Sequence, residues 1–240
     1  MRKNSQYTFT GRVRFSEIGY EKRITLPGII DYFQDCSIFQ SEEIGFGIAY
    51  LAEKKRAWIL SSWQVAVGRY PSLGEEIEVS TWATEFKGIL ASRNFSMTDR
   101  SGERIAYANS LWVYMNMESG RPAKPDGCEV EAYGTGEPLA MEYAPRKIAL
   151  PDHFEDLPEL TVQRHHIDTN GHVNNCQYVQ MAVEAVADEK EICQMRAEYK
   201  RSAVYRDRIF PRVAREEERT VATLCDVQGA PYAIVEFRYR

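Results

Sequence analysis

No stretch of this sequence is long and apolar enough to cross a membrane, and residues 1–8 lack the apolar core of a signal peptide. Basic residues do not outnumber acidic ones, and the net charge of −5 argues against a general nucleic-acid binder. These absences predict a protein of the cytoplasm. The 240 residues, 44% hydrophobic and 12% aromatic, are ample for one large core or two small ones.

Cysteine is sparse, and its spacing gives no sign of a disulfide framework or a zinc site. No two cysteines form a C-x-x-C pair, and their number is odd. We expect most of them to be reduced and buried as small apolar residues. The five are Cys36, Cys128, Cys176, Cys193 and Cys225.

Each half of the chain shows the same order of elements, a strand, a long helix and a series of antiparallel strands, which predicts an α+β fold. In the first half we expect a helix from Leu26 to about Gly45 and strands at 7–14, 57–67, 76–86, 90–99 and 104–117. In the second half we expect a helix at 175–187, capped by Asn174, and strands at 160–166, 195–201, 204–209, 219–227 and 232–239. Prolines and glycines between the halves predict domains at 1–120 and 157–240 joined by a linker at 121–156.

A constant offset of 149 residues aligns the apolar positions of the two halves, although few residues are identical. It pairs Ile18 with Ile167 and Ile24 with Val173. The polar positions do not match. A duplicated unit therefore carries a polar triplet in one copy only, which favours a functional site over a generic turn. The triplet is Asp168, Asn170 and His172, opposite Gly19, Glu21 and Arg23.

The triplet lies in the segment 166–175, His-Ile-Asp-Thr-Asn-Gly-His-Val-Asn-Asn, just before the second long helix. If the segment is extended, alternate side chains point the same way, and an acid, an amide and an imidazole converge. Histidine suits proton transfer near neutral pH, and three of the four histidines lie at 165–172. The alternative is a turn before a capped helix, because Asp, Asn and Gly are common turn residues.

Tryptophan and histidine are divided between the two halves. All four tryptophans, Trp58, Trp63, Trp82 and Trp112, lie in the first half, and all four histidines lie in the second. We interpret the first copy as the source of apolar walls and the second as the source of polar chemistry. Chance placement of rare residues is the alternative.

The eight residues from Asp168 to Asn175, followed by Tyr178, resemble the D-x-N-x-H-V-N-N-x-x-Y signature of acyl-acyl carrier protein thioesterases. Weaker matches lie at Thr81-Trp82, at Ser110-Leu111-Trp112 and at the helix opening Leu26-Pro27 with Tyr32-Phe33-Gln34-Asp35, so the resemblance covers nearly the whole chain from about residue 7. It implies a double hotdog fold, in which two long central helices are each wrapped by an antiparallel sheet. It also implies hydrolysis of the thioester between a fatty acyl chain and the phosphopantetheine arm of acyl carrier protein, with no metal or redox cofactor. The chain resembles bacterial members, because it lacks the N-terminal extension of the plant plastid enzymes.

The resemblance assigns Asp168, Asn170 and His172 as catalytic residues. Thioester hydrolysis needs an activated water, donors for the developing oxyanion and a proton for the departing thiolate. His172 suits the role of base or proton-sharing donor, Asp168 that of orienting the imidazole or water, and Asn170 that of placing water or the carbonyl. The helix start at Asn174 and Asn175 offers backbone N–H groups that polarise a carbonyl.

One position departs from the family pattern. Plant members carry a catalytic Glu in a strand that reads roughly E-Y-R-R-E-C, and the corresponding residues 198–203 here place Ser202 at that Glu. Three consequences are open: Asp168 and His172 suffice, Ser202 holds the water, or activity is reduced or lost. Glu198 is roughly 13 Å from Ser202 along a strand and is expected to be solvated or ion-paired. A Ser202–His172–Asp168 triad is disfavoured because no G-x-S-x-G elbow accompanies Ser202.

Partner and substrate contacts are predicted from charge and apolarity. Acyl carrier protein is acidic, so a docking face should be basic, and the second half is dense in arginine; solvated strand edges mixed with acids are the alternative. The docking candidates are Arg201, Arg206, Arg208 and Arg212, and the substrate-binding candidates are Asn174, Asn175, Tyr178, Trp58, Trp82 and Trp112. Ordinary core packing explains the aromatic candidates equally well.

Two other functions stay open on this sequence. One is hydrolysis of acyl-CoA or another acyl thioester on the same fold. The other, motivated by Ser202, is a non-catalytic module that binds fatty acyl chains. Because two fused hotdog copies already form the minimal pair, either a monomer or a homodimer is expected.

Overall fold

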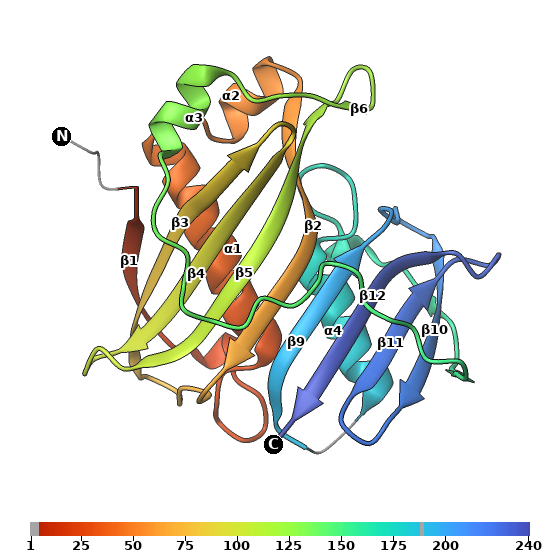
Figure 1. Ribbon diagram of the computed structural model, residues 1–240. Coiled ribbons are helices and arrows are strands. Elements are labelled where there is room, and N and C mark those ends of the chain that lie inside the picture. Colours follow the sequence, from red (N-terminus) through yellow and green to blue (C-terminus); the bar gives the residue numbers. More distant parts are fainter. Residues whose placement is uncertain (1–4, 188–189) are drawn as a thin grey trace. The chain divides into compact units, whose positions relative to one another are not determined.

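The computed structural model describes residues 5–187 and 190–240 (Figure 1). Residues 1–4, on which part of the signal-peptide argument rests, lie outside the described residues. The chain divides into two compact units, and each is described by itself. Unit 1 comprises the chain up to Ser61 together with Val65–Tyr143, and unit 2 comprises Ser62–Gln64 with Ala144–Arg240.

Unit 1 is an antiparallel sheet with a long helix, α1, against one face (Figure 1). Its strand order is β1-β3-β4-β5-β2, and β6 pairs with β5. The elements are β1 (Tyr7–Arg12), a 3-10 turn η1 (Phe15–Glu17), α1 (Leu26–Glu43), α2 (Ile48–Glu53), β2 (Arg56–Val67), β3 (Glu76–Lys87), β4 (Leu90–Asp99), β5 (Arg104–Asn116), β6 (Arg121–Pro122) and α3 (Gly127–Tyr133).

Helix α1 forms because its start is capped and its core face is apolar. The Thr25 hydroxyl accepts a hydrogen bond from the Gly28 N–H at 3.1 Å, and a proline occupies the first turn, where no N–H is needed. Ile29 and Phe33 are fully buried, and the Phe33 ring lies 5.3 Å from that of Phe95 on β4. Burial of each large apolar side chain contributes roughly 1.5–3 kcal/mol, so this face holds α1 on the sheet.

Unit 2 repeats this plan, with helix α4 against one face of a second antiparallel series (Figure 1). Its strand order is β9-β12-β11-β10-β7, and β8 pairs with β10. The elements are β7 (Glu155–Asp156), β8 (Leu160–Thr161), a 3-10 turn η2 (Arg164–His166), α4 (Asn175–Val186), β9 (Ile192–Tyr199), β10 (Arg208–Arg215), β11 (Thr220–Cys225) and β12 (Pro231–Tyr239).

The α+β prediction and most of the predicted elements are confirmed, but two predicted strands are wrong. The strand expected at 160–166 exists only at Leu160–Thr161, and η2 follows it. Of the strand expected at 204–209, residues 204–207 are a loop, and β10 begins only at Arg208. The apolar pair Val204-Tyr205 suggested a strand, but the Asp207 carboxylate accepts a hydrogen bond from the Val204 N–H at 2.9 Å and closes a turn there.

Candidate active site

The segment that carries the polar triplet is a tight turn, so the extended geometry expected from the sequence is wrong. Ile167 and Val173 form an isolated antiparallel bridge that closes it. The Asp168 N–H donates to the His172 carbonyl at 2.8 Å, and the Gly171 N–H donates to the Asp168 carbonyl at 3.1 Å. Gly171 has φ +78°, which glycine adopts without steric cost.

Unit 1 contains the same turn at the predicted offset of 149 residues. Ile18 and Ile24 form the equivalent bridge, and Lys22, opposite Gly171, also has positive φ, +60°. The turn is therefore a property of the backbone and the flanking apolar residues in both units, and it forms without the polar triplet. The matched bonds in unit 1 run from the Gly19 N–H to the Arg23 carbonyl, from the Lys22 N–H to the Gly19 carbonyl and from the Thr25 N–H to the Glu17 carbonyl, each at 3.0 Å.

Asp168 reinforces the turn in unit 2. Its Oδ1 accepts hydrogen bonds from the N–H groups of Asn170 at 2.8 Å and His172 at 3.3 Å, and Gly19 in unit 1 has no side chain that does so. The turn alternative raised from the sequence is thus correct for the Asp168 side chain. One carboxylate oxygen is occupied by backbone amides rather than by the His172 imidazole.

The other two members of the triplet have side chains that the turn does not use. Among the described residues, neither the Asn170 amide nor the His172 imidazole makes a hydrogen bond with its side chain. Asn170 is exposed, and His172 is half-buried beside the start of α4. Both side chains are available to water and to a ligand.

The N-terminus of α4 lies directly after this turn. Asn174, predicted as its cap, accepts a hydrogen bond from the Cys176 N–H at 2.8 Å through its Oδ1, and its carbonyl accepts from the Gln177 N–H at 3.0 Å. In the described part of the chain, the Asn175 N–H is the first-turn donor with no acceptor. It stands at the positive end of the α4 dipole, where it suits a developing oxyanion.

The loop 200–207 brings Ser202 beside the turn. The Val173 N–H donates to the Ala203 carbonyl at 2.9 Å, so the chain neighbours of His172 and Ser202 are hydrogen-bonded to each other. Ser202 is exposed and lies outside any strand. The loop that carries Ser202, at the family's Glu position, is therefore bonded to the residue that follows His172.

Two tyrosines, the buried Tyr178 and the partly buried Tyr199, hold the turn, the helix and the loop together. The Tyr178 hydroxyl accepts a hydrogen bond from the Ala203 N–H at 2.7 Å, and the Tyr199 hydroxyl donates to the Asn175 carbonyl at 3.0 Å. Burial raises the pKa of Tyr178 to about 12 and that of Tyr199 well above its usual value, so both stay neutral. Tyr178 is 2% exposed and acts in this structure as a support of the site.

Tyr199 was not singled out from the sequence, although it lies in the strand expected at 195–201. It is the last residue of β9, and its contact with Asn175 shows that it faces α4. Adjacent strand residues point to opposite faces, so Glu198 faces away from α4. There Glu198 is 2% exposed, pairs with Lys200 and accepts from the Ile148 N–H at 3.2 Å. Glu198 is ion-paired, as expected, but not solvated, and it is directed away from the turn.

His166, just before the turn, is hydrogen-bonded on both sides. Its Nδ1 accepts a hydrogen bond from the Gln163 N–H at 3.0 Å, and its carbonyl accepts from the Asn174 N–H at 2.8 Å. Desolvation, and then the neighbouring His165 at a ring distance of 4.1 Å, lower the pKa of His166. The neutral imidazole is therefore favoured, and it is the form that accepts from Gln163.

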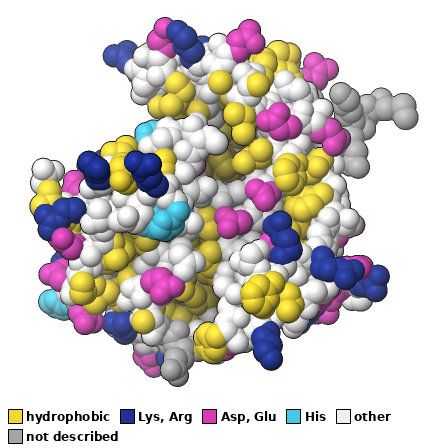
Figure 2. Space-filling view, turned by 180° about the vertical axis from the view of Figure 1, so that it is seen from behind, with side chains coloured by type: hydrophobic (Ala, Val, Ile, Leu, Met, Phe, Trp, Pro, Cys, Tyr) yellow, Lys and Arg dark blue, Asp and Glu magenta, His cyan; other side chains and the backbone are white. Residues whose placement is uncertain are grey.

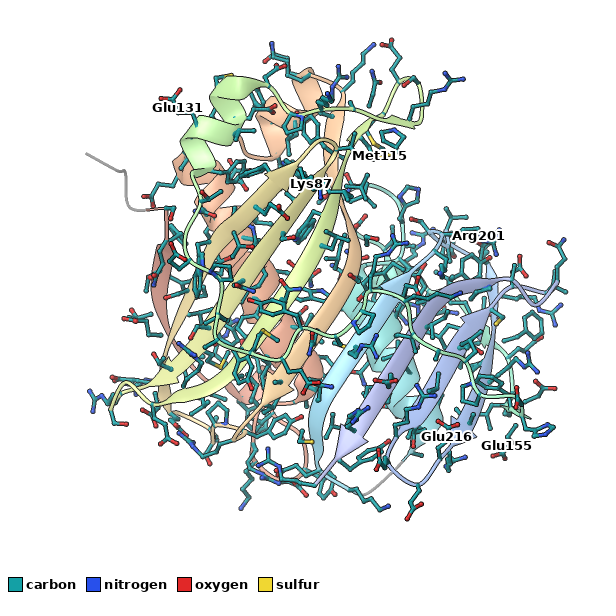
Figure 3. The ribbon with its side chains drawn as sticks, viewed as in Figure 1. Lys87, Met115, Glu131, Glu155, Arg201 and Glu216 are labelled. Atoms are coloured by element: carbon teal, nitrogen blue, oxygen red, sulfur yellow. The ribbon has the colours of Figure 1, made fainter. Side chains whose placement is uncertain are left out.

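The predicted docking arginines do not form one basic face. Arg201 and Glu155, labelled in Figure 3, lie at opposite ends of the sheet of unit 2. Arg212 binds Asp156, the neighbour of Glu155, at 2.7 Å, and on the face drawn in Figure 2 basic side chains are interspersed with acidic ones. Arg201 binds Asp226 at 2.7 Å, and Arg208 pairs with Glu159. Only Arg206 of the four lacks a carboxylate partner among the described residues.

Trp112 faces α1 in unit 1. Arg93 of β4 donates to Gln40 of α1, and Ser110 stands directly opposite Arg93 on β5, so both face the helix. Trp112 lies two residues beyond Ser110 on the same face and donates its Nε1–H to the Ser110 hydroxyl at 2.7 Å. Trp112 therefore lines the interior between α1 and the sheet.

The other two tryptophans predicted to bind substrate, Trp58 and Trp82, lie on different faces of the sheet. The Trp58 ring packs 4.6 Å from that of Tyr114, which lies on the same face as Trp112. Trp82 follows Thr81, which contacts Arg93, so Trp82 is on the opposite face. There its Nε1–H donates to the Glu137 carbonyl at 2.8 Å. Trp82 holds the chain at Glu137 and faces away from the interior beside α1.

Over the described ranges, no three His, Cys, Asp or Glu residues gather in a way that would hold a metal ion. No α-helix in the described part of the chain has the length and apolarity to cross a membrane. The described cysteines are free, and three of the five, Cys36, Cys176 and Cys225, are buried as expected.

A long helix packed on an antiparallel sheet and entered through the same turn, once in each unit, defines a double hotdog fold. The family model for the acyl-ACP thioesterase N-terminal domain, where ACP is acyl carrier protein, matches residues 4–127. The model for the C-terminal domain of the same family matches residues 151–235. The chain belongs to the acyl-ACP thioesterase family.

Known proteins agree with this assignment. A palmitoyl-acyl carrier protein thioesterase of Cuphea hookeriana is 28% identical over 208 residues, covering 79% of this chain and 50% of the relative. A palmitoyl-acyl carrier protein thioesterase of Arabidopsis thaliana is 26% identical over 232 residues, covering 90% of this chain and 55% of the relative. The chain thus spans about half the length of these curated relatives.

Solved structures confirm the fold over the whole chain. An acyl-ACP thioesterase from Bacteroides thetaiotaomicron superposes with a TM-score of 0.90 at 22% identity, covering 100% of both chains. A 12:0-ACP thioesterase from Umbellularia californica superposes with a TM-score of 0.84 at 21% identity, covering 99% of this chain and 98% of the other. The double hotdog expectation is therefore confirmed.

Proposed function

We propose that this protein hydrolyses fatty acyl thioesters of acyl carrier protein to a free fatty acid and the thiol of the carrier. Membership of the acyl-ACP thioesterase family supports the reaction class. The observation that carries the proposal is the repeated turn. Unit 1 builds it with Gly19, Glu21 and Arg23, so folding does not require the imidazole or the amide that unit 2 displays.

In the proposed reaction, a water held between His172 and Asn170 attacks the thioester carbonyl. His172 removes the proton as the new C–O bond forms, and the Asn175 N–H, at the positive end of α4, stabilises the oxyanion. Collapse of the tetrahedral intermediate breaks the C–S bond. The proton on His172 then passes to the departing thiolate, which leaves as the thiol of the pantetheine arm.

Asp168 takes a positioning role in this scheme. Its Oδ1 accepts hydrogen bonds from the backbone N–H groups of Asn170 and His172. Its negative charge therefore lies in the same turn as the imidazole that becomes cationic. Ser202, in place of the family's Glu, supplies a hydroxyl that orients water but does not act as a base near neutral pH. No G-x-S-x-G elbow surrounds it, so we assign it no nucleophilic role.

Ser202 also motivates a second candidate, a module that binds acyl chains without turnover. The exposed Ser202 hydroxyl stands where the family has a carboxylate, and Glu198 is bonded to the Ile148 N–H on the other side of β9 and cannot replace it. This candidate predicts co-purified or titrated fatty acid with no release of thiol. Hydrolysis of acyl-CoA on the same site is the remaining alternative.

The test measures thiol release from acyl-ACP and acyl-CoA of matched chain lengths, by the wild type and by His172→Ala. We expect turnover by the wild type with a higher kcat/KM on acyl-ACP, and loss of turnover in the variant. Higher kcat/KM on acyl-CoA would favour the alternative substrate. Fatty acid binding without any turnover would favour the non-catalytic module and overturn the proposal.

The placement and assembly of the protein stay predictions. We propose a cytoplasmic location, testable by cell fractionation, and either a monomer or a homodimer, testable by light scattering. We propose no cofactor, so extensive treatment with a metal chelator should leave kcat unchanged.

A further inference from the structure

Two arginines flank the exposed Tyr205 beside the candidate site. The guanidinium groups of Arg164 and Arg206 lie 5.5 Å and 5.2 Å from the centroid of the Tyr205 ring. Within the described residues, neither guanidinium has a carboxylate partner, unlike those of Arg201 and Arg212. The positive charge of this pair is therefore not neutralised by the protein.

The hydroxyl of Tyr205, which lies between the two arginines, is affected by both of them. Hydrogen bonding from the side chains of Arg206 and then Arg164 lowers the pKa of the Tyr205 hydroxyl, because these donors favour the phenolate. Tyr205 remains 40% exposed, and both arginines are exposed, so an anion from solvent can reach all three side chains. The cluster presents two planar guanidinium groups and one hydroxyl to the same region.

The backbone of Arg206 is held in an unusual conformation. Its φ is +75°, a left-handed value that costs a non-glycine residue roughly 1–2 kcal/mol. The Arg206 N–H donates to the Val162 carbonyl at 3.1 Å, and the Val162 N–H donates to the Asp207 carbonyl at 2.9 Å. Such strain persists where the surrounding structure over-determines it, and it concentrates at functional sites.

Both sides of the cluster belong to the segments that frame the candidate site. Arg164 begins η2, whose last residue, His166, accepts a hydrogen bond from the Asn174 N–H at 2.8 Å. Tyr205 is two residues beyond Ala203, which is bonded to Val173 at the end of the turn. The cluster is therefore carried by the two segments whose backbones are bonded to Val173 and Asn174, directly after His172.

We propose that Arg164, Tyr205 and Arg206 bind the phosphate group of the pantetheine arm that carries the acyl chain. The inference rests on the proposed function, because it assigns a site for a part of that substrate. Guanidinium groups recognise phosphate oxygens through paired, charge-assisted hydrogen bonds, and the tyrosine hydroxyl adds a third donor. The phosphate is shared by acyl carrier protein and CoA, so the experiment separates these two sources.

Binding is measured first, without hydrolysis. Calorimetric titration compares 4′-phosphopantetheine with pantetheine, which lacks the phosphate, on the wild type and on the double variant Arg164→Met/Arg206→Met. We expect the wild type to prefer the phosphorylated arm by about tenfold, the equivalent of one charge-assisted hydrogen bond, and the double variant to lose that preference. Arg100→Met, an exposed arginine of unit 1 that pairs with Glu76, should keep it.

The inference is wrong if the double variant, folded by circular dichroism, keeps the wild-type preference, or if the wild type shows no preference at all. These outcomes do not depend on turnover, so failure of the proposed function is seen separately as absent thiol release. In kinetic assays we expect the double variant to raise KM about tenfold for acyl-ACP while kcat stays within about twofold. An equal rise for acyl-CoA shows recognition of the phosphate from either source, and a rise for acyl-ACP alone assigns it to the carrier.

Discussion

The Tyr178 hydroxyl accepts a 2.7 Å hydrogen bond from the backbone N–H of Ala203 and so joins helix α4 to the loop that carries Ser202. Ser202, directly before Ala203, stands at the position where the family has a carboxylate. The Ala203 carbonyl accepts from the Val173 N–H at the end of the turn that carries His172. One buried phenol thus sets the spacing between the three segments of the candidate site.

Tyr178→Phe should therefore weaken both stability and activity. The substitution leaves the buried Ala203 N–H without an acceptor, which costs about 1–3 kcal/mol of unfolding free energy. Urea denaturation measures this loss, and kcat should fall because the loop is no longer held. Tyr20→Phe, at a tyrosine that is 89% exposed, is the matched control and should change neither quantity.

His172→Ala should reduce kcat by about 10²–10⁴-fold, the usual contribution of a general base. Because the imidazole makes no hydrogen bond to the described residues, unfolding free energy should change by less than about 0.5 kcal/mol. Thiol release and thermal denaturation check both parts. His153→Ala, at an exposed histidine outside the turn, should behave as wild type. Turnover that persists in His172→Ala would remove His172 from the mechanism.

Asp168 has two roles, accepting hydrogen bonds within the turn and supplying a negative charge, and two variants separate them. Asp168→Asn keeps an oxygen that accepts from the Asn170 and His172 N–H groups, so its stability should match wild type, whereas Asp168→Ala should lose about 1 kcal/mol. If the negative charge supports the imidazolium, kcat of Asp168→Asn falls by about tenfold or more. An unchanged kcat in Asp168→Asn would leave the carboxylate with only its role in the turn.

Ser202→Ala should keep kcat within about threefold of wild type, because a water-orienting hydroxyl contributes far less than a nucleophile. A loss of three or more orders of magnitude, with a covalent acyl-enzyme detectable by mass spectrometry, would instead support the Ser202–His172–Asp168 triad. Ser202→Glu restores a carboxylate beside His172. A large gain in kcat there would mean that the natural site works below the capacity of its fold.

His166 should make stability depend on pH below neutrality. Its pKa in the folded state is lowered from 6.5 by desolvation and by His165, so the unfolded chain takes up the proton first as pH falls. Stability present above pH 6.5 is therefore lost as pH falls through 6.5 towards the lower folded-state pKa, and then levels off. Melting temperatures of wild type and His166→Gln, compared across this range, should converge as pH falls. Parallel curves would contradict the assignment.

Local patterns in the sequence were sufficient for much of the fold. The buried face of α1 and the cap at Asn174 follow from residues close together in the chain, and the duplication follows from comparing the two halves at an offset of 149 residues. The strands expected at 90–99 and 232–239 are likewise confirmed, as Leu90–Asp99 and Pro231–Tyr239. Prediction failed before α4 and again after β9, where an apolar pair such as Val204-Tyr205 has the same pattern in a loop as in a strand.

The amino-acid sequence by itself determined which chemistry is available, an acid, an amide and an imidazole in one copy of a duplicated unit. Only the structure decided their arrangement. Local hydrogen bonds fold the segment into a turn and occupy Asp168 with backbone amides, whereas the bond between Val173 and Ala203, residues distant in the chain, ties the loop that carries Ser202 to the end of that turn. It also neutralised most of the predicted docking arginines and left Arg164 and Arg206 around Tyr205, since ion pairing depends on which side chains fold next to each other.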